Sequence, residues 1–417
     1  MLDHLTSLAR AQTGRAPQPP DLTRREDLEL ARGFAEELLA ADPDAATLRA
    51  MEEELTRDRD AWPLLVHLGL KLALSRRLVR DLEGPAHLSV VFAMFKEHQR
   101  ILTPAEIPGG EDFLRRKAAQ LDWLCAEKED LDWSMVAVDD GCPEGSGDIA
   151  ERIAQEAGLA PRVQVLRLAE AIRTGEPVVA GLQDPSESMK GGSVELGLWH
   201  AARADYPNHV VAFTDADLST HLGQCGLLMD AILRGGADAA IGSRRLAASV
   251  ALKQGSRNLR GKLFIYLWKR IIGVIPEIID TQCGFKAFRA EVVRDIVPGM
   301  LERRFAFDIE LLIKTQLRRE NSIRQIPVAW IDSDTLSTTT DLQPYLPMLR
   351  AMVGMYRHYL PADPTADTFA AFLDGLDEAG WERLQDNIPA AIAERAPAEF
   401  VEFAGVSAAD LEAASRA

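Results

Sequence analysis

Three short apolar runs in the middle of the chain alternate with longer segments of helical periodicity. The runs are residues 88–93, 133–138 and 210–213. Such an alternation is typical of buried parallel strands in an α/β sheet. Carboxylates follow every run, namely Glu97, then Asp139 and Asp140, then Asp215 and Asp217. Because the carboxyl ends of parallel strands open into one crevice, the pattern predicts a single acidic site.

The spacing of Asp215 and Asp217 predicts a metal site. Residues two apart in a strand point to the same side, so both carboxylates can bind one hard cation, Mg²⁺ or Mn²⁺, which would hold a diphosphate. The same spacing also fits an aspartate that caps a following helix, and the residues alone leave this alternative open. A polyanion needs cations nearby, for which Lys190 and Arg244 are the candidates.

The order of these motifs resembles the family-2 inverting glycosyltransferases of the GT-A fold, and within them the dolichyl-phosphate glucosyltransferase and polyprenyl-phosphate hexosyltransferase branch. The resemblance covers residues 88–334. Its blocks are LSVVFAMFKE, VAVDDG, KGGSVELG, VVAFTDADLS, AAIGSRR, DTQCGFKAF, FAFDIELL and IPVAW. It implies an α/β fold with a GT-A (Rossmann-like) nucleotide-binding mixed sheet flanked by helices. It also implies an enzyme that moves a hexose from a nucleotide sugar, with UDP-glucose favoured.

The resemblance further implies roles for individual positions. The donor-binding positions are Glu97, Asp139, Asp140, Lys190, Asp215 and Arg244, the metal ligands are Asp215 and Asp217, and the catalytic base is Asp308. The chain departs from the usual residues of the family at Ala93, Lys96, Cys142 and Glu195. These departures bear on the identity of the donor more than on the reaction.

Asp308 has a second interpretation. It stands where a helical pattern begins, so it also fits a first-turn aspartate that the helix dipole stabilises. A hydroxyl acceptor needs a carboxylate to take its proton, whereas a phosphate acceptor is already an adequate nucleophile. With a phosphate acceptor, Asp308 would only orient the substrate.

A basic segment contradicts the overall acidity of the chain. Residues 239–276 contain eight lysines and arginines and no acidic residue, and their apolar residues fall at helical spacing. This predicts a basic amphipathic helix, either packed in the core or facing a phosphate-bearing acceptor at a membrane surface. The candidate acceptor-binding residues are Arg257, Arg260, Lys262, Lys286 and Glu310. The acceptor is expected to be polyprenyl-phosphate-like, and a soluble hydroxyl compound is the alternative.

Composition limits the partners and the location. The net charge of −17 argues against nucleic-acid binding. The apolar run at residues 62–74 is too short to span a bilayer, and no signal peptide is visible. We therefore expect a cytoplasmic protein without a transmembrane segment, at most peripheral to a membrane. The scattered cysteines and histidines form no metal motif.

The chain divides into four predicted regions: a disordered leader (1–22), a helical extension (23–86), the GT-A domain (87–360) and an acidic helical extension (361–417). The extensions are expected to serve packing or homo-oligomerisation, with docking or acceptor delivery as the alternative. Residues 331–341, rich in Ser and Thr, are a candidate lid. Two other functions stay open: a nucleotidyltransferase, and a non-catalytic GT-A scaffold.

Overall fold

The centre of the molecule is a mixed β-sheet. The computed structural model describes residues 1–16, 19–252, 258–331 and 344–417. Within these ranges the main sheet has seven strands in the order β3-β2-β1-β4-β7-β5-β8, with β7 antiparallel to both neighbours. The strands are β1 (Ala86–Met94), β2 (Leu131–Asp139), β3 (Val163–Arg167), β4 (His209–Thr214), β5 (Ala239–Ser243), β7 (Phe285–Arg289) and β8 (Ile323–Pro327). A separate parallel pair consists of β6 (Val250–Leu252) and β9 (Ala329–Ile331).

Helices cover both faces of the sheet. On one face lie α4 (Leu64–Arg80), α5 (Phe113–Cys125), α6 (Ser146–Glu156) and α9 (Cys225–Leu233), and on the other lie α7 (Leu168–Thr174), α8 (Gly191–Ala202), α11 (Ala290–Ile296) and α12 (Phe307–Arg318). Alternate residues of β1 serve the two cores, since Val90 belongs to the first and Val91 to the second. Burial on both faces explains the continuous apolar runs. The predicted fold class, an α/β mixed sheet flanked by helices, is confirmed.

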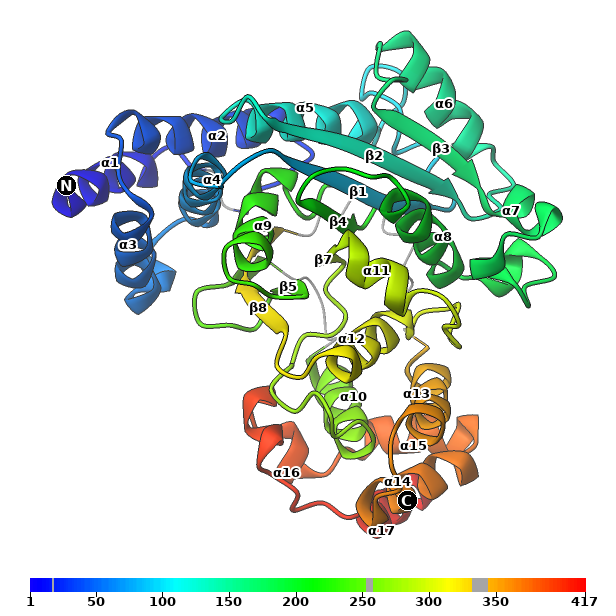
Figure 1. Ribbon diagram of the computed structural model, residues 1–417. Coiled ribbons are helices and arrows are strands. Elements are labelled where there is room, and N and C mark those ends of the chain that lie inside the picture. Colours follow the sequence, from blue (N-terminus) through cyan, green and yellow to red (C-terminus); the bar gives the residue numbers. More distant parts are fainter. Residues whose placement is uncertain (17–18, 253–257, 332–343) are drawn as a thin grey trace.

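The N-terminal extension is part of the main core. Its helices are α1 (Leu2–Thr13), α2 (Arg25–Ala40), α3 (Ala45–Arg57) and α4. Figure 1 shows them in blue at one end of the sheet. Lys71 of α4 is 1% exposed, and its Nζ donates to Glu52 Oε1 at 2.6 Å and to the Pro327 carbonyl at 3.2 Å. An ion pair therefore links α4 to α3, and a hydrogen bond from the same amine links α4 to β8.

The prediction that residues 1–22 form a disordered leader is wrong for its first part, which is helix α1. Leu5 and Ala9 are fully buried against the other N-terminal helices, and Gln12 Nε2 donates to Glu37 Oε2 at 2.9 Å. The prolines behind the prediction all lie after this helix. Apolar residues at helical spacing outweighed them because α2 and α3 offer a surface on which to bury.

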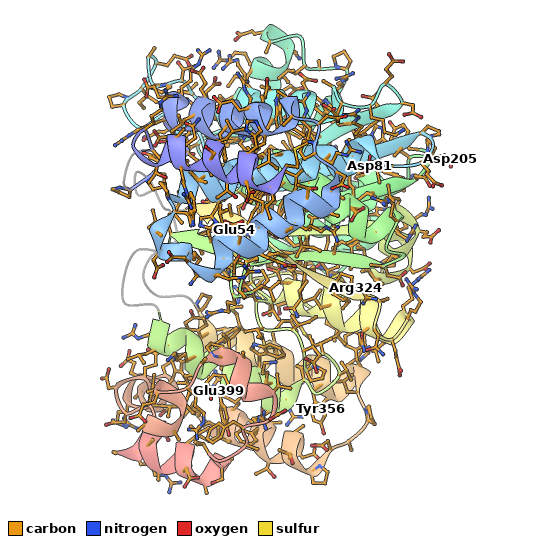
Figure 2. All side chains as sticks on the ribbon, turned by 90° about the vertical axis from the view of Figure 1, so that its left-hand side faces the viewer. Glu54, Asp81, Asp205, Arg324, Tyr356 and Glu399 are labelled. Atoms are coloured by element: carbon orange, nitrogen blue, oxygen red, sulfur yellow. The ribbon has the colours of Figure 1, made fainter. Side chains whose placement is uncertain are left out.

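The C-terminal extension forms a second layer of helices on α10 (Asn258–Ile271). The extension contains α14 (Pro364–Gly375), α15 (Glu378–Asp386), α16 (Ala390–Ala393) and α17 (Ala408–Arg416). These helices and the preceding α13 (Tyr345–Tyr359), which lies within the predicted GT-A domain, share one apolar cluster with α10. Tyr266 and Trp268 of α10 belong to this cluster and are fully buried. Figure 2 shows Tyr356 and Glu399 in this part, well separated from Glu54 in the N-terminal helices.

Two of the basic residues of α10 contact the C-terminal extension. Lys262 Nζ donates to the Ala393 carbonyl at 2.6 Å, and Arg270 Nη2 donates to the Phe400 carbonyl at 2.6 Å. Carbonyls at helix ends need donors, and these two cations supply them. The interpretation of Lys262 as an acceptor contact is therefore corrected. Among the described helices, none has both the length and the apolar content to cross a membrane.

Candidate active site

The sheet brings the predicted carboxylates to one edge. Asp215 and Asp217 follow β4, beside β1 and its neighbour β2. Asp217 Oδ1 accepts from the Ser219 amide at 3.0 Å, which makes a local turn, while the next α-helix begins only at Cys225. The alternative that Asp217 caps this helix is therefore excluded. A side chain at Gly284, the residue before β7, would overlap the Asp215 carboxylate. The glycine therefore leaves room for this carboxylate.

Lys190 neutralises one of the two carboxylates. Its Nζ donates to Asp215 Oδ1 at 2.5 Å. Burial opposes the charge on Asp215, yet Lys190 outweighs it and holds the pKa of this carboxyl below its usual range. In turn, burial disfavours the charge on Lys190, but Asp215 and Asp308 raise its pKa above the usual value. Both groups are thus charged at neutral pH. The Lys190 side chain is 32% exposed and the Asp215 side chain is 29% exposed.

The Asp215–Asp217 pair fits a divalent cation that shares its coordination with a substrate. Within the described ranges, no group of three His, Cys, Asp or Glu side chains could hold a metal ion by itself. Mg²⁺ usually takes one or two carboxylates together with substrate phosphates and water. The side chains of Asp215 and Asp217 are 29% and 25% exposed, so a diphosphate can reach both.

A strained turn fixes the position of Lys190. The backbone has positive φ at Met189 (45°) and Lys190 (104°), which costs roughly 1–3 kcal/mol per residue. The Lys190 amide donates to Asp140 Oδ2 at 2.7 Å, and the Ser193 hydroxyl donates to Asp140 Oδ1 at 2.6 Å. A side chain at Gly191 would collide with the Arg303 backbone. Asp140 therefore holds the turn that carries Lys190.

The neighbouring Asp139 holds a different loop. Its Oδ1 accepts from the Cys142 amide at 2.7 Å, and its Oδ2 accepts from the Gly147 amide at 2.7 Å. A Cβ at Gly147 would lie 2.5 Å from Asp139 Oδ2, so only glycine allows this approach. The structure thus engages both oxygens of Asp139 in shaping the β2–α6 loop, in contrast to the donor contact expected from the sequence.

Asp308 and Lys286 form a buried ion pair close to Asp215. Lys286 on β7 is fully buried, and its Nζ donates to Asp308 Oδ1 at 2.5 Å and to the Cys283 carbonyl at 2.6 Å. Asp308 lies in the first turn of α12. Burial raises the pKa of Asp308, while Lys286 and Lys190 oppose the rise. Lys286, predicted as an acceptor contact, is instead buried and binds the Asp308 carboxylate.

A group of buried charges lies next to Asp217, and of its members only Glu97 was predicted from the sequence. Arg100 pairs with Glu111 at 3.0 Å and with Glu97 at 3.2 Å, and its guanidinium lies 3.7 Å from Asp217. Burial raises the pKa of Glu97 to about 7. Lys117 of α5 is fully buried, its amine has no hydrogen-bond partner within the described structure, and burial lowers its pKa to about 8. Arg100, Glu111 and Lys117 lie in helix and loop segments whose sequence pattern does not indicate buried charges.

The other predicted residues lie apart from this group. Glu310 is fully buried and accepts from the amides of Leu301 (2.6 Å) and Glu302 (2.7 Å) and from the Tyr359 hydroxyl (2.5 Å). Its predicted acceptor contact is therefore corrected, because α12 turns Glu310 away from Asp308. Arg260 lies on α10 and is partly exposed.

Two predictions fall on residues outside the described ranges, Arg257 and the lid at 331–341 beyond Ile331. The departure at Glu195 has a structural partner, since its carboxylate pairs with Arg303 at 2.5 Å inside the protein.

Comparisons with known proteins agree with the motifs. No protein-family model matches the chain. A dolichyl-phosphate beta-glucosyltransferase of Trichomonas vaginalis is 25% identical over 221 residues, which are 52% of this chain and 58% of that protein. The dolichyl-phosphate beta-glucosyltransferase of Saccharomyces cerevisiae is 27% identical over 261 residues, covering 59% and 67%. The chain thus spans about three fifths of the length of the first of these relatives.

Among solved structures, a glucosyl-3-phosphoglycerate synthase from Mycobacterium tuberculosis in complex with UDP is similar, with a TM-score of 0.45 and 17% identity over 69% of this chain and 85% of that one. The chain is therefore similar in sequence to dolichyl-phosphate beta-glucosyltransferases, as its motifs predicted.

Proposed function

We propose that the chain is a metal-dependent inverting glycosyltransferase, which moves a hexose from a UDP-sugar, with UDP-glucose favoured, to a polyprenyl-phosphate-like acceptor. The observation that carries this proposal is the alternation of charges at the end of β4. Lys190 pairs with Asp215 at 2.5 Å, Lys286 pairs with Asp308 at 2.5 Å, and Asp217 lies beside the first pair. The names of the sequence relatives support the same reaction.

The residues of the chain divide the work of a single displacement at the anomeric carbon. Asp215 and Asp217 would hold Mg²⁺ or Mn²⁺, which when bound neutralises the charge that develops on the departing diphosphate. Lys190 adds a positive charge at the same place. Because its backbone is held in a strained conformation, this charge needs little movement when the substrate binds. Asp140 keeps Lys190 there by accepting from its backbone amide.

Asp308 faces the acceptor side of this arrangement. Lys286 holds one of its oxygens from the buried side, which leaves the carboxylate oriented by the core rather than by solvent. A phosphate acceptor brings its own negative oxygen as nucleophile, so Asp308 then orients the acceptor. This is a positioning role.

A soluble hydroxyl acceptor is the second candidate, and one observation favours it. Burial raises the pKa of Asp308, which makes this carboxylate a better proton acceptor than an exposed aspartate. The alternative differs from the first only in the nucleophile. The kinetics of Asp308 variants separate the two.

Replacement of Asp217 by Asn tests the proposed function. The substitution removes a metal-ligand charge, so we expect loss of metal-dependent UDP binding and a fall in turnover of about a hundredfold or more. Calorimetry with UDP and Mg²⁺ and a transfer assay measure the two effects. Asp205→Asn is the matched control, because Asp205 is exposed before the start of β4, as Figure 2 shows. Full activity of Asp217→Asn in the presence of a chelator would refute the metal assignment.

A further inference from the structure

A large pocket lies between the N-terminal extension and the loop that carries Arg244. Its volume is about 700 Å³. One wall is the segment 59–64 that joins α3 to α4, and the other is formed by Arg244 and residues 249–251 of β6 and its approach. A pocket of this size suits a small-molecule ligand. The N-terminal extension is therefore a wall of a cavity as well as a covering for the sheet.

Arg59 gives the first wall a positive charge. Its side chain is exposed, and its Nη1 donates to the Ser249 carbonyl of the opposite wall at 3.1 Å. Arg59 forms no ion pair with any residue that the structure describes, although the chain carries a net charge of −17. Asp60 lines the same wall and is the one acidic residue among the described residues of the lining. An arginine that is anchored by a carbonyl and keeps its charge uncompensated suits an anion.

Arg244 connects the second wall to the candidate active site. Asp280 holds its guanidinium through Nε at 2.8 Å and Nη2 at 2.7 Å, and the guanidinium lies over the Trp330 ring at 5.2 Å. Its position is thus fixed before any ligand arrives. Its charge also helps to lower the pKa of Asp215, so Arg244 lies within electrostatic reach of the metal site. A ligand in the pocket can therefore extend from Arg59 toward the point of transfer.

We propose that this pocket binds the phosphate-bearing end of the acceptor and that the N-terminal extension, through Arg59 and Trp62, takes part in selecting it. Guanidinium groups on two facing walls match a phosphomonoester, which accepts hydrogen bonds on several oxygens. Trp62 and Pro63 add an apolar surface beside this charge. The inference rests on the proposed function, and it assigns to the N-terminal extension a part of the acceptor site.

Charge reversal at Arg59 tests the inference in the full-length protein. The probes are phenyl phosphate, which is soluble, and farnesyl phosphate, which carries a short isoprenoid chain. In Arg59→Glu we expect at least about tenfold weaker binding of both, measured by calorimetry with and without UDP and Mg²⁺. Arg59→Lys should retain most of the affinity. Arg57→Glu is the matched control, because Arg57 is exposed two residues earlier and does not line the pocket.

The binding of UDP separates this inference from the proposed function. We expect Arg59→Glu to bind UDP and Mg²⁺ within about twofold of the parent protein. A parent protein that binds no UDP would count against the proposed function, whatever Arg59 does. Unchanged phosphate binding in Arg59→Glu with intact UDP binding would overturn the inference. An equal loss in Arg57→Glu would also overturn it, because overall charge would then be the cause.

Trp62→Ala distinguishes the source of the phosphate. A loss confined to farnesyl phosphate would support the pocket with a lipid phosphate as its ligand. An equal loss for both probes would support it with a soluble phosphomonoester. Unchanged affinity for both would overturn the role assigned to Trp62.

Discussion

At the scale of single residues, the site is organised by pairs of opposite charge that the fold holds at fixed distances. Lys190 is held by a strained turn, Lys286 by full burial, and their partners Asp215 and Asp308 by the end of β4 and the first turn of α12. Such groups need little rearrangement when a charged substrate arrives. The pairs also leave each residue with a distinct and measurable task.

Asp308→Asn reports on the nucleophile. The amide keeps an oxygen that accepts from Lys286, so the local structure should survive. With a polyprenyl phosphate as acceptor, the nucleophile is already anionic, and we expect turnover to stay within about tenfold of the parent. Steady-state kinetics with the donor saturating measure this. A fall of about 10² to 10⁴, together with loss of the acidic limb of the pH–rate profile, would instead favour the hydroxyl acceptor.

Glu97 gives the stability of the protein a pH dependence. Burial raises its pKa to about 7 from an ordinary value of 4.5. Between these two values the folded protein keeps a proton that the unfolded chain has lost, so the free energy of unfolding falls as the pH rises, by up to about 3 kcal/mol. Glu97→Gln should flatten this part of the curve. Denaturant unfolding at several pH values measures it.

Glu83→Gln is the control for this prediction, because Glu83 is an exposed glutamate. It should leave the slope of stability against pH unchanged. A parallel curve for Glu97→Gln and the parent protein would show that Arg100 keeps Glu97 ionised throughout this range.

At the scale of elements, the sequence predicted those that carry their signal locally. The apolar runs of β1, β2 and β4 fall where the structure has them, and the carboxylates after them meet at one edge. The partly buried β3 and the antiparallel β7 between β4 and β5 were not predicted, since their positions depend on pairing across the sheet. Helix α1 was missed because nearby prolines dominated the local pattern.

The same difference between local and tertiary signals explains the site. Asp215, Asp217 and Asp308 could be selected from motifs, because strand ends and helix starts dictate their direction. The residue with which each charge pairs could not be predicted from the sequence. Lys286 stands on a strand and pairs with a residue on a helix 22 positions later, and Lys117 becomes a buried amine only through the packing of α5. The partners of Glu310, two backbone amides and the Tyr359 hydroxyl, likewise depend on tertiary packing.

At the scale of the whole molecule, two helical extensions lie on different parts of the sheet and have different consequences. The N-terminal helices bury α4 in the main core and reach the pocket beside Arg244. The C-terminal helices, which Figure 1 shows in orange and red, share a separate apolar cluster with α10. Lys262 and Arg270 of α10 thus help to join the C-terminal helices to the rest of the chain.

Lys262 tests this last assignment, because it was a candidate acceptor residue and its amine instead donates to the Ala393 carbonyl at 2.6 Å. Lys262→Met keeps the length of the side chain but leaves that carbonyl without its donor. We expect the free energy of unfolding to fall by about 1–2 kcal/mol and the KM for the acceptor to change less than twofold. Urea unfolding and acceptor kinetics measure the two effects, with Lys262→Arg as the variant that restores a donor. Unchanged stability with a tenfold rise in the acceptor KM would return α10 to the acceptor site, since the cation would then act on the substrate and not on the fold.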